Sequence, residues 1–154
     1  MKFEKESCSV KELVDDLYLA HQLLVPTHLR FSKEAEGDLF IYTDKKRLSQ
    51  VITNFLTNAC KFTNSGYIKL GFKHLRGTDE AAIFVEDSGI GLSEEEQEKV
   101  FSRFFKQDEF SQGAGLGLSI CQGIVQNLGG RIALSSKLGK GSRFSVVLPV
   151  YKGG

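Results

Sequence analysis

The pattern of hydrophobic and polar residues predicts four helices. Apolar residues recur at helical spacing over 9–25, 44–62 and 118–128, and each stretch has a capping or breaking residue at an end. The apolar positions of the first stretch are Val10, Leu13, Val14, Leu17 and Leu24. A short fourth helix is expected over 93–101, which opens with a capping box. Each long helix has one apolar face, which predicts packing against a shared core.

Strands are predicted between these helices. The expected strands cover 29–35, 39–42, 67–74, 81–85, 131–135 and 142–148. The first two flank a turn at Gly37–Asp38, the middle two form a hairpin through 76–79, and the last two flank the glycine turn 139–141. Helices separated by hairpins predict a two-layer α/β sandwich of the α+β type. Its sheet would be mixed and mostly antiparallel, with the helices on one face.

Composition narrows the class of protein. The chain has 154 residues, 41% hydrophobic and 25% charged, which fits one soluble domain with a single core. Its net charge of +1 favours neither nucleic acid nor an anionic membrane as a partner, so any anion must be bound by local features. The three cysteines have no paired spacing, which indicates free thiols. Without a membrane span or secretory signal, we expect a cytoplasmic location and no direct membrane contact.

The stretch 44–62 carries a row of polar residues beside its apolar stripe. At 100° per residue, Asn54, Asn58 and Lys61 fall on one face of the predicted helix. An amide oxygen is an uncharged ligand that suits Mg²⁺, and a lysine one turn further on can neutralise phosphate oxygens. A solvated helix face is the alternative interpretation, and the row alone does not decide between the two.

Two glycine-containing loops are candidates for binding a nucleotide. Asp87 ends an apolar strand, where its carboxylate can accept a hydrogen bond from an exocyclic amine, while Gly89 and Gly91 let a ring approach the backbone. This combination suits adenine, and an ordinary strand-to-loop turn is the alternative. The run 113–117 precedes a helix, so its amides and the helix N-terminus can hold phosphates. It lacks the Walker and Rossmann spacings, and a flexible linker is the alternative.

Taken in order, these motifs resemble the conserved boxes of sensor histidine kinases. The run 50–63 is similar to the asparagine box, 87–91 to the first glycine box, 101–105 to the phenylalanine box and 113–117 to the second glycine box. The turn 139–144 is similar to the closing glycine turn. Because the boxes are ordered and cover nearly the whole chain, the resemblance is specific. It implies the Bergerat ATP-binding fold, shared with DNA gyrases, ninety-kilodalton heat-shock chaperones and mismatch-repair ATPases.

The resemblance implies a role for each residue that matches a box. Asn58 would ligate Mg²⁺, while Asn54 and Lys61 would attend the phosphates of ATP. Phe62 would pack near the nucleotide. Asp87 would accept a hydrogen bond from the adenine amino group.

The glycine boxes would surround the same nucleotide. Gly89 and Gly91 would give the adenine ring room, and 106–112 would form a mobile ATP lid. Nucleotide contacts are also expected from Gly113, Gly115, Leu116, Gly117 and Leu118. Side chains that would anchor the lid or contact phosphate are Phe101, Phe104, Arg103 and Lys106.

One position separates the branches of this fold. Hydrolytic members that resemble gyrase carry glutamate one turn before the metal asparagine, as a base that activates water, and Asn54 stands there. An amide takes no proton at neutral pH, so hydrolysis is disfavoured and transfer to a protein nucleophile is favoured. The resemblance therefore implies a protein histidine kinase, an ATP-dependent phosphotransferase of two-component signal transduction.

The phosphate acceptor is expected on another domain. In the family it is a histidine on a helical dimerisation domain, and His21, His28 and His74 lie in no such context. The expected segments are a linker from that missing domain at 1–8, the catalytic domain at 9–150 and a tail at 151–154. The expected partners are the dimerisation domain and a response regulator receiver domain, and the chain alone should not phosphorylate itself.

Two alternatives remain at this point. The first is an ATPase or serine kinase of the same fold, against which the asparagine box ending in Lys61–Thr63 argues. The second is a non-catalytic module that senses nucleotide, against which the intact boxes argue.

Overall fold

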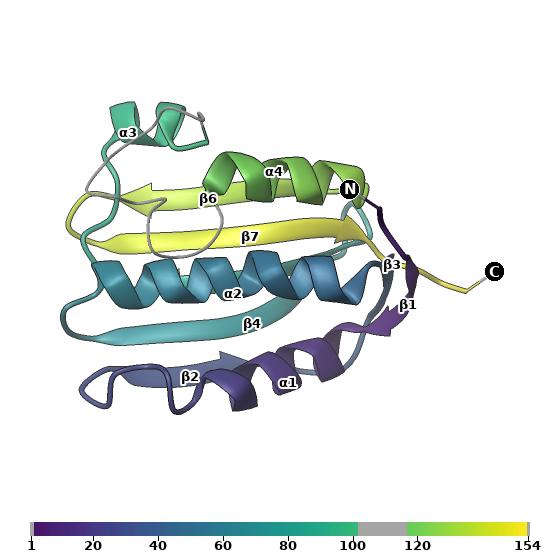
Figure 1. Cartoon of the computed structure of the whole chain (residues 1–154), viewed down its shortest axis with the longest axis horizontal. Coiled ribbons are helices and arrows are strands. Elements are labelled where there is room, and N and C mark those ends of the chain that lie inside the picture. The colour runs from purple at the N-terminus through teal and green to yellow at the C-terminus, as the bar shows by residue number, and fades with distance from the viewer. Residues whose placement is uncertain (1, 102–116, 154) are drawn as a thin grey trace.

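The protein consists of a five-stranded sheet with helices packed on one of its faces (Figure 1). The computed structural model describes residues 2–101 and 117–153. In chain order the elements are β1 (Glu6–Ser9), α1 (Val10–His21), β2 (Arg30–Glu34), β3 (Phe40–Thr43), α2 (Lys45–Phe62), β4 (Tyr67–Leu75), β5 (Glu80–Asp87), α3 (Glu94–Lys99), α4 (Leu118–Asn127), β6 (Arg131–Lys137) and β7 (Gly141–Pro149). The two-layer α/β sandwich predicted from the sequence is confirmed.

The sheet is mixed, as expected, and its order is β2-β4-β5-β7-β6. Only the pairing of β2 with β4 is parallel, and the other three pairings of this sheet are antiparallel. The predicted hairpins β4–β5 and β6–β7 are both present. The last strand of the chain, β7, therefore lies inside the sheet, between β5 and β6.

The strands on either side of the Gly37 turn do not pair with each other. β2 joins the edge of the large sheet beside β4, and β3 pairs with β1 in a separate two-stranded sheet. The strand β1 was not predicted, because its four residues carry no run of β-branched or aromatic side chains. Its buried residues Cys8 and Ser9 pair with Ile41 and Phe40 of β3.

Helix α1 is shorter than the apolar pattern predicted. It ends at His21 and not at Pro26, and the amides of Leu24 and Val25 both donate to the His21 carbonyl in the turn that follows. The prediction that Leu24 belongs to the buried face is wrong, because 69% of this residue is exposed. Val25, which is 6% exposed, covers the core in its place.

Helix α2 lies across the middle of the sheet, between α1 and α4 (Figure 1). Of the two residues able to cap it, Thr43 and Asp44, it is Asp44 whose side chain accepts from the Arg47 amide, at 3.1 Å. Its buried apolar residues are Leu48, Val51, Ile52, Phe55, Leu56 and Ala59. Because these apolar residues pack into the core, they determine which polar residues of α2 face the rest of the molecule.

The two remaining helices begin as predicted. Ser93 and Glu96 form both hydrogen bonds of a capping box at the start of α3. Gly117 is the N-cap of α4, and it offers no side chain to cap the helix. The first amides of α4 therefore depend on other partners.

Candidate functional site

Two of the three residues in the polar row of α2 are buried. Asn54 is 1% exposed and Asn58 is 4% exposed, so the alternative of a solvated helix face is wrong for both. Neither the Oδ1 nor the Nδ2 atom of Asn58 has a hydrogen-bond partner among the residues that the structure describes, and the same holds for Oδ1 of Asn54. A buried polar atom without a partner costs about 1–3 kcal/mol, so these atoms are suited to a bound ligand or ion.

The third residue of the row, Lys61, lies in the last turn of α2 and is exposed. Its Nζ atom lies 5.7 Å from the centroid of the Phe62 ring. The positive charge therefore stands at the end of the helix, beside an aromatic ring, while the two amides lie inside. A cation in that place can approach anionic groups from the solvent side.

A narrow cavity brings the asparagine helix and the Asp87 loop together. It measures about 10 Å³ and is lined by Phe55, Asn58, Ala59, Phe62, Val85, Asp87, Ile90, Gly91, Ser142 and Phe144. The sequence placed Asn58, Phe62, Asp87 and Gly91 at one site, and the structure does bring these four together. The remaining lining is largely apolar, which suits the faces of a planar ring. The cavity has room for about one water molecule, so a nucleotide base would enter only if its walls move apart.

Asp87 is the titratable group of this cavity. Burial raises the pKa of its carboxyl group to about 6, although the hydrogen bond from the Gly89 amide opposes the shift. The Gly89 amide donates to Oδ1 across 2.8 Å. The carboxylate is therefore the main form at neutral pH, held in place and facing an apolar cavity.

The glycines of the Asp87 loop are needed for close packing of the backbone. A Cβ atom on Gly89 would lie 2.3 Å from the Phe62 carbonyl oxygen. Gly91 has a φ of +69°, and a Cβ atom there would lie 2.2 Å from the Lys137 carbonyl oxygen. These contacts hold the loop against the end of α2 and the β6–β7 turn, which explains both glycines without a ligand.

A family model matches the part of the chain that builds this site. The family is described as histidine kinase-, DNA gyrase B-, and HSP90-like ATPase, and the match covers residues 43–152. The chain belongs to this family.

Individual members of the family are similar over most of this chain. Sensor histidine kinase RcsC of Escherichia coli K12 is 42% identical over 160 residues, which cover 98% of this chain and 16% of RcsC. Adaptive-response sensory kinase SasA of Synechococcus sp. JA-3-3Ab is 40% identical over 128 residues, which cover 80% of this chain and 34% of SasA. The chain thus spans about a sixth to a third of the length of these two relatives.

Solved structures of histidine kinase ThkA show the same architecture. The catalytic domain of ThkA is 31% identical, with a TM-score of 0.81, and the match covers 97% of this chain and 96% of that one. ThkA in complex with the response regulator protein TrrA is 28% identical, with a TM-score of 0.79, over 97% of this chain and 42% of that one. The chain is therefore an ATP-binding catalytic domain of this family.

Part of the second glycine box of this ATPase domain can be placed. Gly117 caps α4, and the Leu118 side chain is 2% exposed in the core, so a ligand would meet Leu118 only through its main chain. Phe101 is half-buried and packs edge-on against Phe144, with ring centroids 6.4 Å apart. The predicted site residues Lys106, Gly113, Gly115 and Leu116 lie outside the described residues, as do Arg103, Phe104 and the proposed lid at 106–112.

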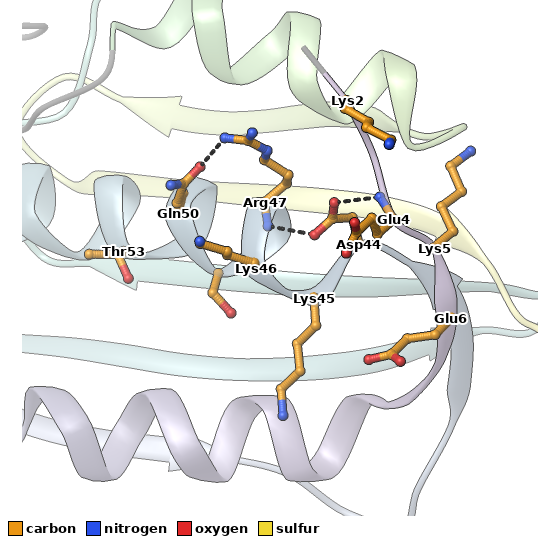
Figure 2. A pocket seen from close by; sticks show the side chains of 11 residues that line it. Lys2, Glu4, Lys5, Glu6, Asp44, Lys45, Lys46, Arg47, Gln50 and Thr53 are labelled. Carbon is orange, nitrogen blue, oxygen red and sulfur yellow. Dashed lines mark hydrogen bonds between the residues drawn. The ribbon is translucent and has the colours of Figure 1, made fainter.

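A much larger depression lies at the other end of α2, between the N-terminal segment and the first turns of the helix (Figure 2). We call it the N-terminal groove; it measures about 950 Å³ and is lined by Lys2, Glu4, Lys5, Glu6, Asp44, Lys45, Lys46, Arg47, Ser49, Gln50 and Thr53. Its buried acid already has partners, because Asp44 accepts from the Glu4 and Arg47 amides at 2.8 and 3.1 Å. The other charges are mostly exposed, so size alone does not make this groove the ATP site.

Three residues that contact the predicted site residues were missed in the sequence. Ser142 pairs with Asp87 in the register of β5 and β7, and the buried Thr63 side chain lies near the Asp87 carboxyl group without a hydrogen-bond partner among the described residues. The Sγ atom of Cys121 accepts a hydrogen bond from Asn54 Nδ2 across 3.4 Å. Ser142 faces Asp87 because β5 pairs with β7 in that register. No local pattern reveals a contact between distant segments, although Thr63 ends the asparagine box and Ser142 lies in the closing glycine turn.

Within residues 2–101 and 117–153, no helix is both long and apolar enough to cross a membrane. The same part of the chain holds no cluster of three or more His, Cys, Asp or Glu side chains able to bind a metal ion.

Proposed function

We propose that this domain binds ATP together with Mg²⁺ and donates the γ-phosphate to a histidine of a dimerisation domain in the same protein. The observation that carries the proposal is the pair of buried asparagines, Asn54 and Asn58, whose Oδ1 atoms have no partner among the described residues. Asn58 also lines the same cavity as Asp87. Stable folded domains rarely leave such atoms unpaired, so a ligand at this place is expected to satisfy them.

Asp87 and the apolar walls of the cavity suit adenine. A buried carboxylate that already accepts from the Gly89 amide has further lone pairs for an exocyclic amino group. Guanine carries an oxygen at the corresponding place, which a carboxylate repels. The site should therefore favour ATP over GTP, and Gly89 and Gly91 would leave room for the ring once the cavity opens.

The amide of Asn58 fits Mg²⁺. Its Oδ1 atom is a hard and uncharged ligand, and the atom has no partner among the described residues. Magnesium would neutralise charge on the phosphates, while Lys61 supplies a second positive charge at the end of α2. The amides that Gly117 and Leu118 present at the start of α4 would hold phosphate oxygens.

Asn54 favours transfer over hydrolysis. In this place a carboxylate would take a proton from water, which an amide does not do at neutral pH. The domain would then act mainly by positioning ATP and neutralising its charge, with the nucleophile coming from the partner. None of the three histidines of this chain lies in the context of the acceptor, so a separate domain is expected to supply it.

A receiver domain of a response regulator is the second proposed partner. The complex of ThkA with TrrA supports this assignment by similarity. We also propose that the domain works in the cytoplasm, where ATP is present and where the free thiols of Cys8, Cys60 and Cys121 stay reduced. The proposed segments remain a linker at 1–8, the catalytic domain at 9–150 and a tail at 151–154.

The test is a calorimetric titration with a non-hydrolysable ATP analogue, with and without Mg²⁺, followed by the corresponding GTP analogue. We expect saturable binding that Mg²⁺ strengthens and that prefers adenine. Addition of [γ-³²P]ATP and a supplied dimerisation domain should label that domain and leave the chain alone unlabelled. Release of free phosphate without labelling would favour the ATPase alternative, and binding without either reaction would favour the nucleotide-sensing module.

A further inference from the structure

Strand β5 ends in two consecutive acidic residues whose side chains lie on opposite faces of the sheet. Asp87 lines the narrow cavity together with α2, on the face that the helices cover (Figure 1). Because side chains alternate along a strand, Glu86 lies on the other face. It lines a depression of about 450 Å³ there, and Asp87 and Ser142 border both this depression and the narrow cavity. The proposed adenine acceptor therefore has a second carboxyl group directly behind it.

Glu86 is held by partners from both neighbouring strands. Tyr67 on β4 donates its hydroxyl to Oε2 of Glu86 across 2.8 Å. Arg143 on β7 contacts Oε1 with its Nε atom at 2.8 Å and its Nη2 atom at 2.7 Å. Although burial opposes the change, these contacts lower the pKa of the Glu86 carboxyl group. Glu86 is therefore negatively charged at neutral pH.

The sheet fixes the position of Arg143. The register of β5 with β7 pairs Arg143 with Glu86 and, next to them, Ser142 with Asp87. The guanidinium carbon of Arg143 also lies 3.9 Å from the centroid of the Phe84 ring, a cation–π contact. The side chains of Arg143 and Glu86 are 28% and 22% exposed. Water and salt therefore screen this ion pair less than a fully exposed pair.

The charge of Glu86 acts on Asp87. Burial, and in addition the negative charge of Glu86, raises the pKa of the Asp87 carboxyl group. The other ionisable groups around the two carboxyl groups are Tyr67, Lys69, Lys137, Lys140 and Arg143. On the cavity side, the lining residues that α2 contributes carry no charge. Among the cations of the described residues, Arg143 is the one that hydrogen-bonds to Glu86, so it offsets this repulsion most directly.

We propose that Arg143 is a positioning residue for adenine recognition, because its pairing with Glu86 neutralises the charge behind Asp87 and keeps Asp87 a carboxylate. This inference rests on the proposed function and adds to it a residue that lies behind the cavity. A carboxylate accepts from the amino group of adenine, whereas a protonated carboxyl group can also donate to the oxygen of guanine. Arg143 therefore sustains the preference for ATP over GTP near neutral pH.

The first test needs no nucleotide and follows the Asp87 carboxyl carbon by ¹³C NMR as a function of pH. The signal is assigned by its loss in Asp87→Asn, and the expected midpoint in wild type is about 6. Arg143→Gln should raise the midpoint by about half to one pH unit, and Glu86→Gln should lower it by a similar amount. The double variant Glu86→Gln/Arg143→Gln should titrate close to wild type, because both charges are then absent.

Two further variants separate the charge of Arg143 from its packing. Arg143→Lys keeps a positive charge and should leave the Asp87 midpoint close to that of wild type. Arg131→Gln is the matched control, because Arg131 pairs with Glu80 across 2.8 Å at the other end of β5. It should leave the Asp87 midpoint unchanged. If Arg143→Gln does not fold, the opposite shift expected in Glu86→Gln still decides the test.

The consequence for adenine is tested with the ratio of ATP-analogue to GTP-analogue affinity between pH 5 and 8. Both analogues carry the same triphosphate, so the ratio reports on the base. In wild type the ratio should rise as the pH passes through about 6, because Asp87 ionises. In Arg143→Gln this rise should move to higher pH by the same amount as the NMR midpoint, and in Arg131→Gln it should stay as in wild type.

The outcomes separate this inference from the proposed function. Equal Asp87 midpoints in wild type, Arg143→Gln and Glu86→Gln overturn the inference, whatever the chain binds. Shifted midpoints with an unshifted affinity ratio also overturn it, because the ion pair then has no effect on recognition of the base. If wild type binds neither analogue, the proposed function fails, and the positioning role fails with it even where the NMR midpoints report the ion pair.

Discussion

The two ends of helix α2 differ in a way that separates a functional site from an ordinary surface. The N-terminal groove is large, about 950 Å³, and its acid Asp44 is already satisfied by main-chain amides. The cavity at the other half of the helix measures only about 10 Å³, yet it holds buried amide atoms without partners among the described residues and a carboxyl group of raised pKa. The buried Thr43 hydroxyl just before α2 also has no partner among the described residues, so a single unpartnered atom does not distinguish the two ends. Unpartnered amide atoms together with a carboxyl group of raised pKa, more than volume, mark the ATP end of this domain.

The largest difference between the two ends should appear when Asn58 is removed. Asn58→Ala should weaken binding of Mg²⁺ with the ATP analogue by about 100-fold, because the amide ligand is lost. Without nucleotide, the free energy of unfolding should stay equal or rise, since two unpartnered buried atoms disappear. Calorimetry and urea unfolding measure the two effects. Lys46→Ala in the N-terminal groove is the control, and equal binding by both variants would contradict the assignment.

The raised pKa of Asp87 makes stability depend on pH. Its carboxyl group has a pKa of about 6 in the folded chain against an ordinary value of 3.8, so the folded state binds its proton more readily. The resulting stabilisation is complete below about pH 4 and is lost as the pH rises through about 6, which amounts to about 3 kcal/mol at most. The free energies of unfolding of wild type and Asp87→Asn are measured in urea between pH 4 and 7.5. As the pH rises, the value for the variant should increase relative to that for wild type. A constant difference between the two free energies of unfolding over this pH range would show that this pKa is not raised.

The turn behind the cavity offers a matched pair of glycines. Gly141 has a φ of +106°, and a Cβ atom there would lie 2.0 Å from the Asp87 carbonyl oxygen. Gly139 has a φ of +82°, and no atom of the described residues lies within 4 Å of its Cβ position. Gly141→Ala should lower the free energy of unfolding by about 2–4 kcal/mol, and Gly139→Ala by about 1 kcal/mol. The free energies are measured by urea unfolding. If both variants lost the same amount, the close contact at Gly141 would not stabilise the ATP end.

The smallest effect is expected from the charges of the N-terminal groove. Lys45 and Asp16 form an exposed ion pair at 3.6 Å, and such pairs contribute little. Lys45→Ala and Lys46→Ala should each change the free energy of unfolding by less than about 0.5 kcal/mol. Their affinity for the ATP analogue should equal that of wild type. A tenfold loss in either variant would make the groove part of the site and remove the contrast between the two ends.

Local sequence patterns predicted what depends on neighbours along the chain. The helix through Asn58, the β4–β5 hairpin and the loop after Asp87 each follow from spacing, capping and turn residues, and the structure confirms them. The pairing of β2 with β4 could not be predicted in this way, because a parallel partner lies far away in sequence. The early end of α1 was missed because Leu24 fits the helical spacing although the chain has already turned.

The site shows the same division. The boxes predicted that Asn58 and Asp87 serve one ligand, since residues matched to known motifs carry their spatial arrangement with them. Spacing within α2 did not reveal that Asn54 is buried against Cys121, because that contact depends on how α4 packs on α2. Thr63 and Ser142 reach Asp87 through the end of α2 and through the β5–β7 register.

The position of β7 has a consequence for how the protein is made. Of the strands that the structure describes, β7 leaves the ribosome last, yet it lies between β5 and β6 in the finished sheet. Until residues 141–149 emerge, β5 presents an unpaired edge, and β6 lacks its partner in the sheet. The nascent chain therefore passes through a stage with open strand edges, and chains stopped before β7 are expected to aggregate. Synthesis of this domain depends on its final strand closing the sheet from within.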